Sequence, residues 1–164
     1  MSLKIKVLGQ HYADMCADII SKSISGHFVQ KLSEYRVSYV KIDKIPILEK
    51  GPIEEPDFLL ILDTAEITAE NLKGLTKEST IIINTQEKNT PAAVKKQKAT
   101  AILIDAADIS LRHTGKSNPV LPVIATLVKR TNEISLKNLE LAIRAAKFPD
   151  GSIAATEEAH KLVR

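Results

Sequence analysis

The feature that most constrains the fold is a run of five apolar residues, Phe58–Leu62, with no polar residue inside it. A strand with one face in water alternates apolar and polar side chains, whereas a strand buried on both faces is apolar throughout. Two shorter runs, Ile81–Ile83 and Ala101–Ile104, have the same character. We therefore predict that these three runs are central strands of a parallel sheet. An exposed edge position for Phe58–Leu62 would contradict this prediction.

Strand-like and helix-like segments alternate along the rest of the chain. Leu3–Val7 and Val37–Ile42 are further strand candidates. Residues 43–56 contain three prolines and Gly51, which predicts a loop with room for a short edge strand. Helical spacing or a capping residue predicts seven helices: Ala13–Ile24, Thr68–Lys73, a segment from Pro91, Asp105–Arg112, Val120–Lys129, a segment from Leu136, and Ser152–Val163.

This alternation predicts a single domain over residues 1–164 with an α/β fold. We expect a Rossmann-like, open, mostly parallel sheet flanked by helices in three layers. Ligands of such folds bind at the carboxyl ends of the strands. In this chain the candidate ends are Gly9–Tyr12, Asp63–Glu66, Asn84–Glu87 and Asp105–Asp108.

Composition excludes several classes of function. The net charge of +3 is too small to indicate a nucleic-acid partner. Cys16 is the only cysteine, which excludes an internal disulfide and a cysteine-ligated cluster, and no two histidines have the spacing of metal ligands on one helix. We therefore predict no metal site. The N-terminal segment lacks a signal-peptide core and no apolar run approaches the ~20 residues that span a bilayer, so we expect a cytoplasmic protein without a membrane partner.

Four segments follow one another in an order found in one known family. Pro52–Asp63 contains Glu-Pro-Asp followed by an apolar strand, and Leu72–Asn84 contains a leucine-lysine pair, a turn, an apolar strand and an asparagine. Ile104–Ile109 leads from a strand end into a short helix, and Asn118–Lys147 contains an apolar helix followed by a helix that begins at Ser-Leu. This collinear series resembles the gamma subunit, or gamma domain, of the pyruvate (2-oxoacid):ferredoxin oxidoreductase family.

The first signature of that family is altered here. Its first strand runs into a Gly-x-Gly-Gly-Gln-Gly loop, but this chain has Gly9-Gln-His-Tyr-Ala-Asp14 and keeps only the first glycine. Such a loop uses glycine for positive φ and for close approach of backbone N–H groups to an anion. The resemblance therefore implies that Gly9, Gln10 and His11 form a degenerate cofactor-binding loop. Because Asp14 places negative charge where a phosphate would bind, we expect no tight binding of a phosphate or dinucleotide.

The second signature, Glu-Met-Arg-Gly-Gly in the family, corresponds to Ser33-Glu-Tyr-Arg-Val37. Both glycines are lost, while Glu34 and Arg36 remain. The resemblance implies that these two residues are remnants of a site or of a partner contact. A surface ion pair is the alternative interpretation.

The resemblance implies a gamma-type subunit of a 2-oxoacid:ferredoxin oxidoreductase complex. Such a complex oxidatively decarboxylates a 2-oxoacid to an acyl-CoA, using thiamine diphosphate, iron–sulfur clusters and coenzyme A. The implied partners are catalytic, thiamine-binding subunits and ferredoxin-like subunits. We expect no cofactor bound by this chain, no catalytic residue in it, and no catalysis by it alone. Two alternatives remain: a non-catalytic binding or scaffold protein that keeps the fold, and a stand-alone nucleotide-binding α/β protein.

One predicted helix bears on oligomerisation. Val120–Val128 is almost wholly apolar, and a helix that is apolar on all sides must be covered on all sides. We expect a homo- or hetero-oligomer in which another copy or a catalytic subunit supplies part of the cover. The alternative is that the terminal helix, Ser152–Val163, supplies it within the same chain.

Three further features have a structural interpretation. Cys16 falls on the apolar side of its predicted helix, which indicates a core thiol. Asp43 follows a strand without a glycine fingerprint and is interpreted as a loop carboxylate. Thr114–Ser117 resembles the end of a phosphate-binding loop, but the required earlier glycine and preceding strand are missing.

Overall fold

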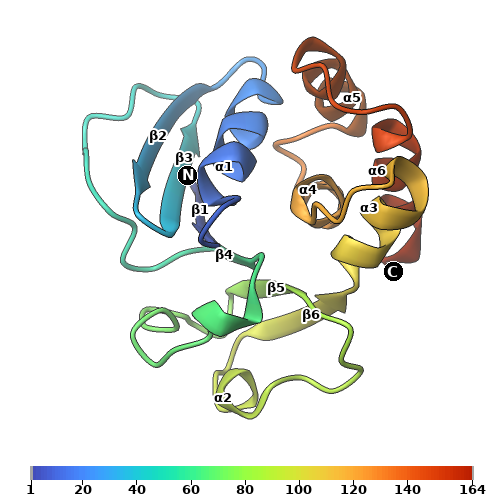
Figure 1. Ribbon diagram of the computed structural model, residues 1–164. Coiled ribbons are helices and arrows are strands. Elements are labelled where there is room, and N and C mark those ends of the chain that lie inside the picture. The colour runs from blue at the N-terminus through green and yellow to red at the C-terminus, as the bar shows by residue number, and fades with distance from the viewer. Residues whose placement is uncertain (1, 164) are drawn as a thin grey trace.

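The computed structural model describes residues 2–163, which form a 6-stranded sheet with helices packed against it (Figure 1). The strand order is β2-β3-β1-β4-β5-β6. Strands β1, β4, β5 and β6 are mutually parallel, whereas β3 runs antiparallel to both β1 and β2. The elements are β1 (Leu3–Leu8), α1 (Ala13–Lys22), β2 (Phe28–Glu34), β3 (Val37–Asp43), β4 (Phe58–Ile61), η1 (Thr64–Glu66), β5 (Thr80–Asn84), α2 (Ala92–Lys95), β6 (Thr100–Ile104), α3 (Ala106–Thr114), α4 (Val120–Val128), α5 (Leu136–Ala145) and α6 (Ser152–Leu162).

The apolar run that predicted a central strand does form one. β4 lies between β1 and β5, and all of its residues are buried. Phe58 and Leu60 belong to the core on one face of the sheet, and Leu59 and Ile61 belong to the core on the other. A strand in this position needs apolar side chains on both faces, because neither face meets water.

The prediction that Ala101–Ile104 is central is wrong, because β6 is an edge strand. Its apolar side chains are nevertheless needed on both faces of the sheet. Ile102 and Ile104 pack with the core between the sheet and the helices, while Ala101 and Leu103 pack with the core on the opposite face of the sheet. An apolar run therefore indicates that both faces of a strand are buried. It does not indicate whether the strand has a neighbour on each side.

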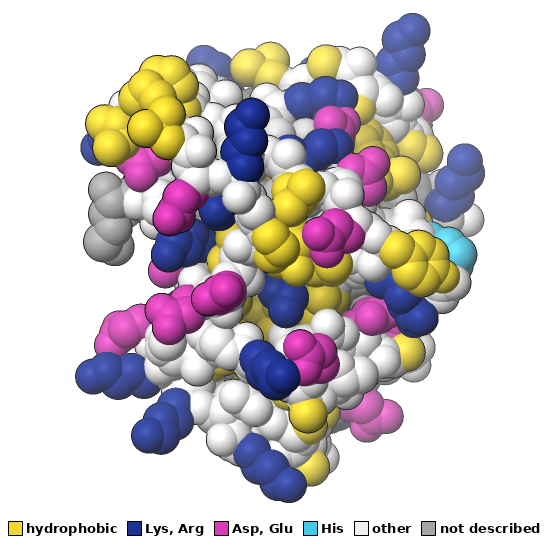
Figure 2. Space-filling model, turned by 90° about the vertical axis from the view of Figure 1, so that its left-hand side faces the viewer, with side chains coloured by type: hydrophobic (Ala, Val, Ile, Leu, Met, Phe, Trp, Pro, Cys, Tyr) yellow, Lys and Arg dark blue, Asp and Glu magenta, His cyan; other side chains and the backbone are white. Residues whose placement is uncertain are grey.

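An antiparallel hairpin, β2–β3, extends the sheet at its other edge. β2 has no counterpart among the predicted strands because it is mostly polar and partly exposed, with Gln30, Lys31, Ser33 and Glu34 among its residues. Asp43 is the last residue of β3, and residues 44–56 form the rest of the predicted loop and contain no strand. The hairpin and this loop lie on the side shown in Figure 2, where charged side chains of both signs surround smaller apolar areas.

Helices α1, α3, α4, α5 and α6 lie on one face of the sheet (Figure 1). Every residue of α4 is buried, because the sheet, α1, α3, α5 and α6 surround it. The expectation that another copy or subunit covers Val120–Val128 is therefore wrong, since the chain covers this helix itself and α6 packs along it. None of the helices within residues 2–163 is long and apolar enough to cross a bilayer.

The third layer, on the opposite face, is thin. A second core cluster there joins Leu59, Ile61 and Leu72 to Val94 of the short helix α2. The predicted helix over Thr68–Lys73 is instead a series of hydrogen-bonded turns that ends at Gly74, which has φ of 79°. A segment this short gains few helical hydrogen bonds after nucleation, so local turns compete successfully.

Candidate functional site

The carboxyl ends of the four parallel strands surround a cleft of about 470 Å³. All four predicted segments contribute to its lining, together with two residues from the segment that precedes α4. The lining residues are Gly9, Gln10, His11, Tyr12, Leu62, Asp63, Thr64, Asn84, Thr85, Gln86, Glu87, Asp105, Ala107, Ser117 and Pro119. The structure thus brings Gly9, Gln10 and His11 together at the edge where an α/β sheet binds ligands.

Gly9 is held at the start of the cleft by close packing. A Cβ atom at this position would lie 3.0 Å from Cβ of Leu62, which follows β4. The N–H of Gly9 donates to the carbonyl of Arg36 at 3.0 Å, and its carbonyl accepts from the N–H of Ala13 at 3.3 Å. Glycine is therefore favoured at position 9 because the ends of β1 and β4 lie too close together there for a side chain. Its φ is not positive.

Polar side chains at the other strand ends are engaged in local structure. The amide nitrogen of Asn84 donates to the carbonyl of Leu62 at 3.0 Å, and its amide oxygen accepts from the N–H of Ala107 at 3.1 Å. Asp63 accepts from the N–H of Ala65, and Asp105 accepts from the N–H of Asp108. These contacts fix the rim of the cleft, and Asn84 ties β4, β5 and the start of α3 together. Sequence reasoning named the segment but had no signal for this role of Asn84.

The electrostatics of the cleft disfavour a polyphosphate ligand. Its charged lining residues are Asp63, Glu87 and Asp105, and no lysine or arginine lines it. Asp14, in the first turn of α1, lies outside this lining and is paired with Lys31 of β2 at 3.0 Å. A hydrogen bond from Ser33, together with the neighbouring Lys31, lowers the pKa of Asp14, so this carboxyl is charged at neutral pH. The phosphates of a dinucleotide, thiamine diphosphate or coenzyme A therefore do not fit this cleft.

The side chains of the chain also do not fit a metal centre. Within residues 2–163, no group of three or more His, Cys, Asp or Glu side chains is placed to hold a metal ion. Cys16 is fully buried in α1, and burial raises the pKa of its thiol. An iron–sulfur cluster needs several cysteine thiolates, so one inaccessible thiol does not fit such a cluster.

A thermal-shift experiment tests the electrostatic interpretation of the cleft. Nicotinamide and flavin dinucleotides at about 1 mM should raise the midpoint of unfolding by less than ~1 °C. A ligand with a Kd of about 10 μM would instead stabilise the native state by ~2.7 kcal/mol and shift the midpoint by several degrees. A saturable shift of that size would contradict the account of the cleft.

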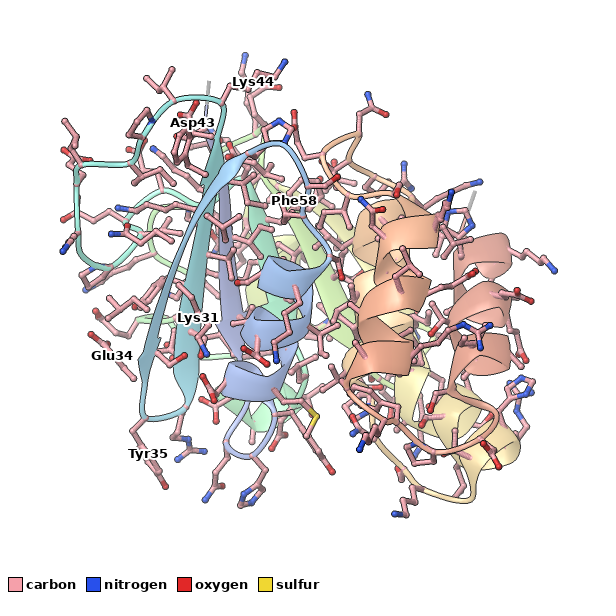
Figure 3. The ribbon with its side chains drawn as sticks, turned by 90° about the horizontal axis from the view of Figure 1, so that it is seen from above. Lys31, Glu34, Tyr35, Asp43, Lys44 and Phe58 are labelled. Atoms are coloured by element: carbon pink, nitrogen blue, oxygen red, sulfur yellow. The ribbon has the colours of Figure 1, made fainter. Side chains whose placement is uncertain are left out.

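The two residues predicted as remnants of the second signature lie at the turn of the hairpin. Glu34 is exposed at the end of β2, and Figure 3 shows Tyr35 at the tip of the turn, at the other end of the hairpin from Asp43 and Lys44. Arg36 follows with φ of 68°, which is unusual for a residue other than glycine. The structure therefore places the hairpin tip beside the cleft loop, where the amide nitrogen of Gln10 donates to the hydroxyl of Tyr35 at 3.4 Å.

Arg36 contacts the carboxyl end of β4 through an ion pair. Its Nε and Nη2 atoms both lie 2.7 Å from Oε1 of Glu66, which is buried in η1. Glu66 also accepts an amide hydrogen bond from Asn71 through its backbone carbonyl. The ion pair thus joins the hairpin, the segment after β4 and the turns that follow. Of the two predicted remnants, Arg36 has this contact and Glu34 does not.

Replacing Arg36 with alanine should lower the free energy of unfolding by about 2 kcal/mol, because it leaves the buried Glu66 carboxylate without its charged donor. The exposed pair Lys22–Asp18 on α1 provides the control, and Lys22→Ala should cost about 0.5 kcal/mol or less. Urea denaturation followed by circular dichroism measures both values. Equal losses for the two variants would show that the Arg36–Glu66 contact contributes no more than a surface pair.

The remaining candidates have the structural roles that the sequence indicated. Asp43 lies at the end of β3 and accepts from the N–H of Ile45, away from the cleft. Gly115, within the motif that resembles a phosphate loop, is the left-handed residue that ends α3. The neighbouring His113 contacts Glu158 of α6 at 2.5 Å, which connects two helices outside the cleft.

Comparison with known proteins decides the family. A family model described as pyruvate ferredoxin/flavodoxin oxidoreductase matches residues 25–162. The chain belongs to this family. The pyruvate/ketoisovalerate oxidoreductases common subunit gamma of Pyrococcus abyssi is 26% identical over 149 residues, which cover 83% of this chain and 80% of that protein. The pyruvate synthase subunit PorC of Thermotoga maritima is 25% identical over 148 residues, which cover 82% and 77%.

Solved structures show the same fold. The crystal structure of the pyruvate oxidoreductase subunit PORC from Thermotoga maritima superposes with a TM-score of 0.80 at 20% identity, covering 98% of this chain and 94% of that chain. A 2-oxoglutarate:ferredoxin oxidoreductase from Magnetococcus marinus gives a TM-score of 0.70 at 14% identity, covering 98% of this chain and 30% of that chain. These matches confirm the predicted Rossmann-like α/β fold, and the family model confirms the predicted family.

Proposed function

We propose that this chain is a gamma-type subunit of a 2-oxoacid:ferredoxin oxidoreductase complex. The observation that carries the proposal is the family match over residues 25–162, which includes nearly the whole sheet and all helices after α1. Relatives named as gamma subunits or as PorC are matched over 69% to 91% of their length, so the comparison extends over most of each relative. The complex would oxidatively decarboxylate a 2-oxoacid, reduce ferredoxin and form an acyl-CoA.

The proposal assigns the cofactors to the partner subunits. Thiamine diphosphate, the iron–sulfur clusters and coenzyme A would be held by catalytic and ferredoxin-like subunits. Two properties of this chain support that division: its single cysteine cannot ligate a cluster, and the acidic lining of its cleft does not suit phosphates. The single buried cysteine also agrees with the reducing conditions of the cytoplasm, where we place the complex.

The role left to this chain is assembly, with a contribution to the acyl-acceptor side of the complex. The cleft loop and the hairpin tip are joined by Gly9, Gln10, Tyr35 and Arg36, so they present one continuous surface to a partner. Glu34 and His11 are exposed on this surface. We assign a partner contact to this surface.

A scaffold protein that keeps the fold without the chemistry is the second candidate. The observation that favours it is the loop Gly9-Gln-His-Tyr-Ala-Asp14, in which a carboxylate stands near the start of α1. A stand-alone nucleotide-binding protein has less support, because the same carboxylate and the acidic cleft oppose phosphate binding.

Affinity purification from the native organism separates the first two candidates. A tagged copy of the chain should retain subunits that carry thiamine diphosphate and iron, in a constant ratio through a second purification step. A purification with the same tag on an unrelated protein controls for proteins that bind the resin or the tag non-specifically. Recovery of the chain without a thiamine-dependent subunit would favour the scaffold and contradict the proposed function.

A further inference from the structure

The edge strand β6 has an open side within the described residues 2–163, where β5 is its only strand neighbour (Figure 1). Backbone groups on an open strand edge can pair with another strand. Natural proteins usually protect such an edge with lysine, proline, a bulge or a covering element. β6 reads Thr-Ala-Ile-Leu-Ile and contains none of these residues, whereas β2 at the opposite edge carries Lys31 and Glu34.

The hydrogen bonds to β5 determine which groups of β6 point outward. The N–H of Thr100 donates to the carbonyl of Ser79 at 3.0 Å, and the carbonyl of Ile104 accepts from the N–H of Thr85 at 2.9 Å. Alternate residues of a strand direct their N–H and C=O groups to the same side. Thr100, Ile102 and Ile104 therefore face β5, while Ala101 and Leu103 direct both backbone groups toward the open side.

A groove lined by apolar side chains and by Asp105, Asp108, Arg112 and Arg130 runs beside this open edge. It has a volume of about 520 Å³ and lies between β6, α3 and the end of α6. Leu162 on its rim has 60% of its surface exposed, which is high for a leucine at the end of a packed helix. Its apolar lining residues are Ala101, Ile102, Leu103, Ile104, Ile109, Leu162 and Val163.

We propose that the open edge of β6 pairs antiparallel with β6 of a second copy of this chain, with the twofold axis at Ile102. In this register Ala101 lies opposite Leu103 of the second copy, and Leu103 lies opposite Ala101. Residues that both point outward exchange both of their backbone hydrogen bonds. Every outward group of Ala101 and Leu103 is thereby satisfied, and the two sheets become one continuous sheet.

Charge complementarity favours a second copy over an unrelated strand. Lys98 precedes β6 and Asp105 follows it, while Asp108 is already paired with Arg112 and Arg130 lies in the same groove. Antiparallel pairing brings Lys98 of one strand toward Asp105 of the other. In the proposed register Asp105 lies opposite Ala99 of the second copy, next to its Lys98. Opposite charges at neighbouring cross-strand positions are favourable, whereas a parallel pair would bring like charges together.

Register-specific crosslinking tests the arrangement in the full chain. Ile102 faces Ile102 of the second copy in a non-hydrogen-bonded pair, where Cα atoms lie ~4.5 Å apart, within the range that a disulfide needs. Ile102→Cys should therefore form a crosslinked dimer under mild oxidation. Leu103→Cys is the matched control, because its equivalent residue lies two positions along the opposite strand and should crosslink far more slowly. Native Cys16 is fully buried and does not interfere.

Sedimentation velocity measures the association itself. The native chain at micromolar concentration should sediment as a species of twice the chain mass of 18.0 kDa. Leu103→Pro removes an outward N–H together with the packing of the Leu103 side chain against the second core, so it should weaken the dimer by about tenfold or more, and circular dichroism checks that the fold is retained. Leu103→Lys, a second variant, should act in the same way if the proline perturbs the strand. Leu141→Lys, at an exposed leucine of α5, should leave the dimer unchanged.

Three results would overturn the proposal. The native chain could remain monomeric at about 100 μM; the dimer could persist in both Leu103 variants with an unchanged circular dichroism spectrum; or Ile102→Cys could crosslink no faster than Leu103→Cys. If the edge variants instead abolish capture of a different subunit while the native chain is a monomer, the edge belongs to that subunit. These measurements use the chain alone, so their outcome is independent of the proposed function.

Discussion

Replacing Gly74 with alanine is expected to lower the free energy of unfolding by about 3 kcal/mol or more. Gly74 has φ of +79°, and a Cβ atom there would lie 1.7 Å from the backbone oxygen of Glu54. The left-handed conformation alone costs an alanine ~1–2 kcal/mol, and the clash adds to this because a backbone carbonyl cannot rotate away as a side chain can. The segment that must shift leads directly into β4, the central strand.

Gly115→Ala is the matched control for this prediction. Gly115 has a nearly identical φ of +72°, but nothing lies within 4 Å of its Cβ position. Its replacement should therefore show only the conformational cost of about 1 kcal/mol. Urea denaturation at neutral pH, followed by circular dichroism, gives both values. A loss for Gly74→Ala no larger than that for Gly115→Ala would contradict the close packing of residues 54 and 74.

The central part of the fold could be predicted from sequence because a strand that is buried on both faces has an uninterrupted run of apolar residues. β4 and β5 are apolar at every buried position, α4 begins and ends close to the predicted residues, and α5 begins at the predicted residue. Ser135 precedes the helix predicted from Leu136 and caps it, because its hydroxyl accepts from the N–H of Asn138. These features depend on local chemistry and on the period of apolar residues.

The edges of the sheet could not be predicted in the same way. β6 has the composition of a central strand but lacks a second strand neighbour within the described chain, and β2 is too polar to resemble a strand. The position of a strand within a sheet depends on long-range pairing, which side-chain composition does not encode. The packing of α6 over α4 is also a long-range contact. The sequence alone therefore could not decide whether α6 or another subunit covers α4.

At the site, the sequence identified the right segments and missed the contacts between them. The four strand ends and the segment Ser33–Val37 were all named, but nothing in the sequence pairs Arg36 with Glu66, which lies 30 positions away. Asn84 was named only as a member of a strand end, although its amide joins three elements. Such contacts follow from the packing of the folded chain, and neither spacing nor composition reports them.

The isolated chain should not catalyse oxidation of a 2-oxoacid. Cleavage of a 2-oxoacid needs the electron sink that thiamine diphosphate supplies, and the acidic cleft of this chain does not suit its phosphates. Purified chain with thiamine diphosphate, Mg²⁺, coenzyme A and pyruvate should reduce an artificial acceptor no faster than buffer does. Denatured chain provides the control for contaminating metal. Steady reduction that scales with the concentration of folded chain would contradict this prediction.

The central claim is that this chain is a working subunit of the complex, and reconstitution tests it most directly. The partner subunits that purify with the chain should be assayed for 2-oxoacid-dependent reduction of ferredoxin and formation of acyl-CoA, with the chain added and with it omitted. The account predicts at least about a tenfold higher rate when the chain is present, equivalent to ~1.4 kcal/mol in the barrier. Equal rates with and without the chain would contradict the account.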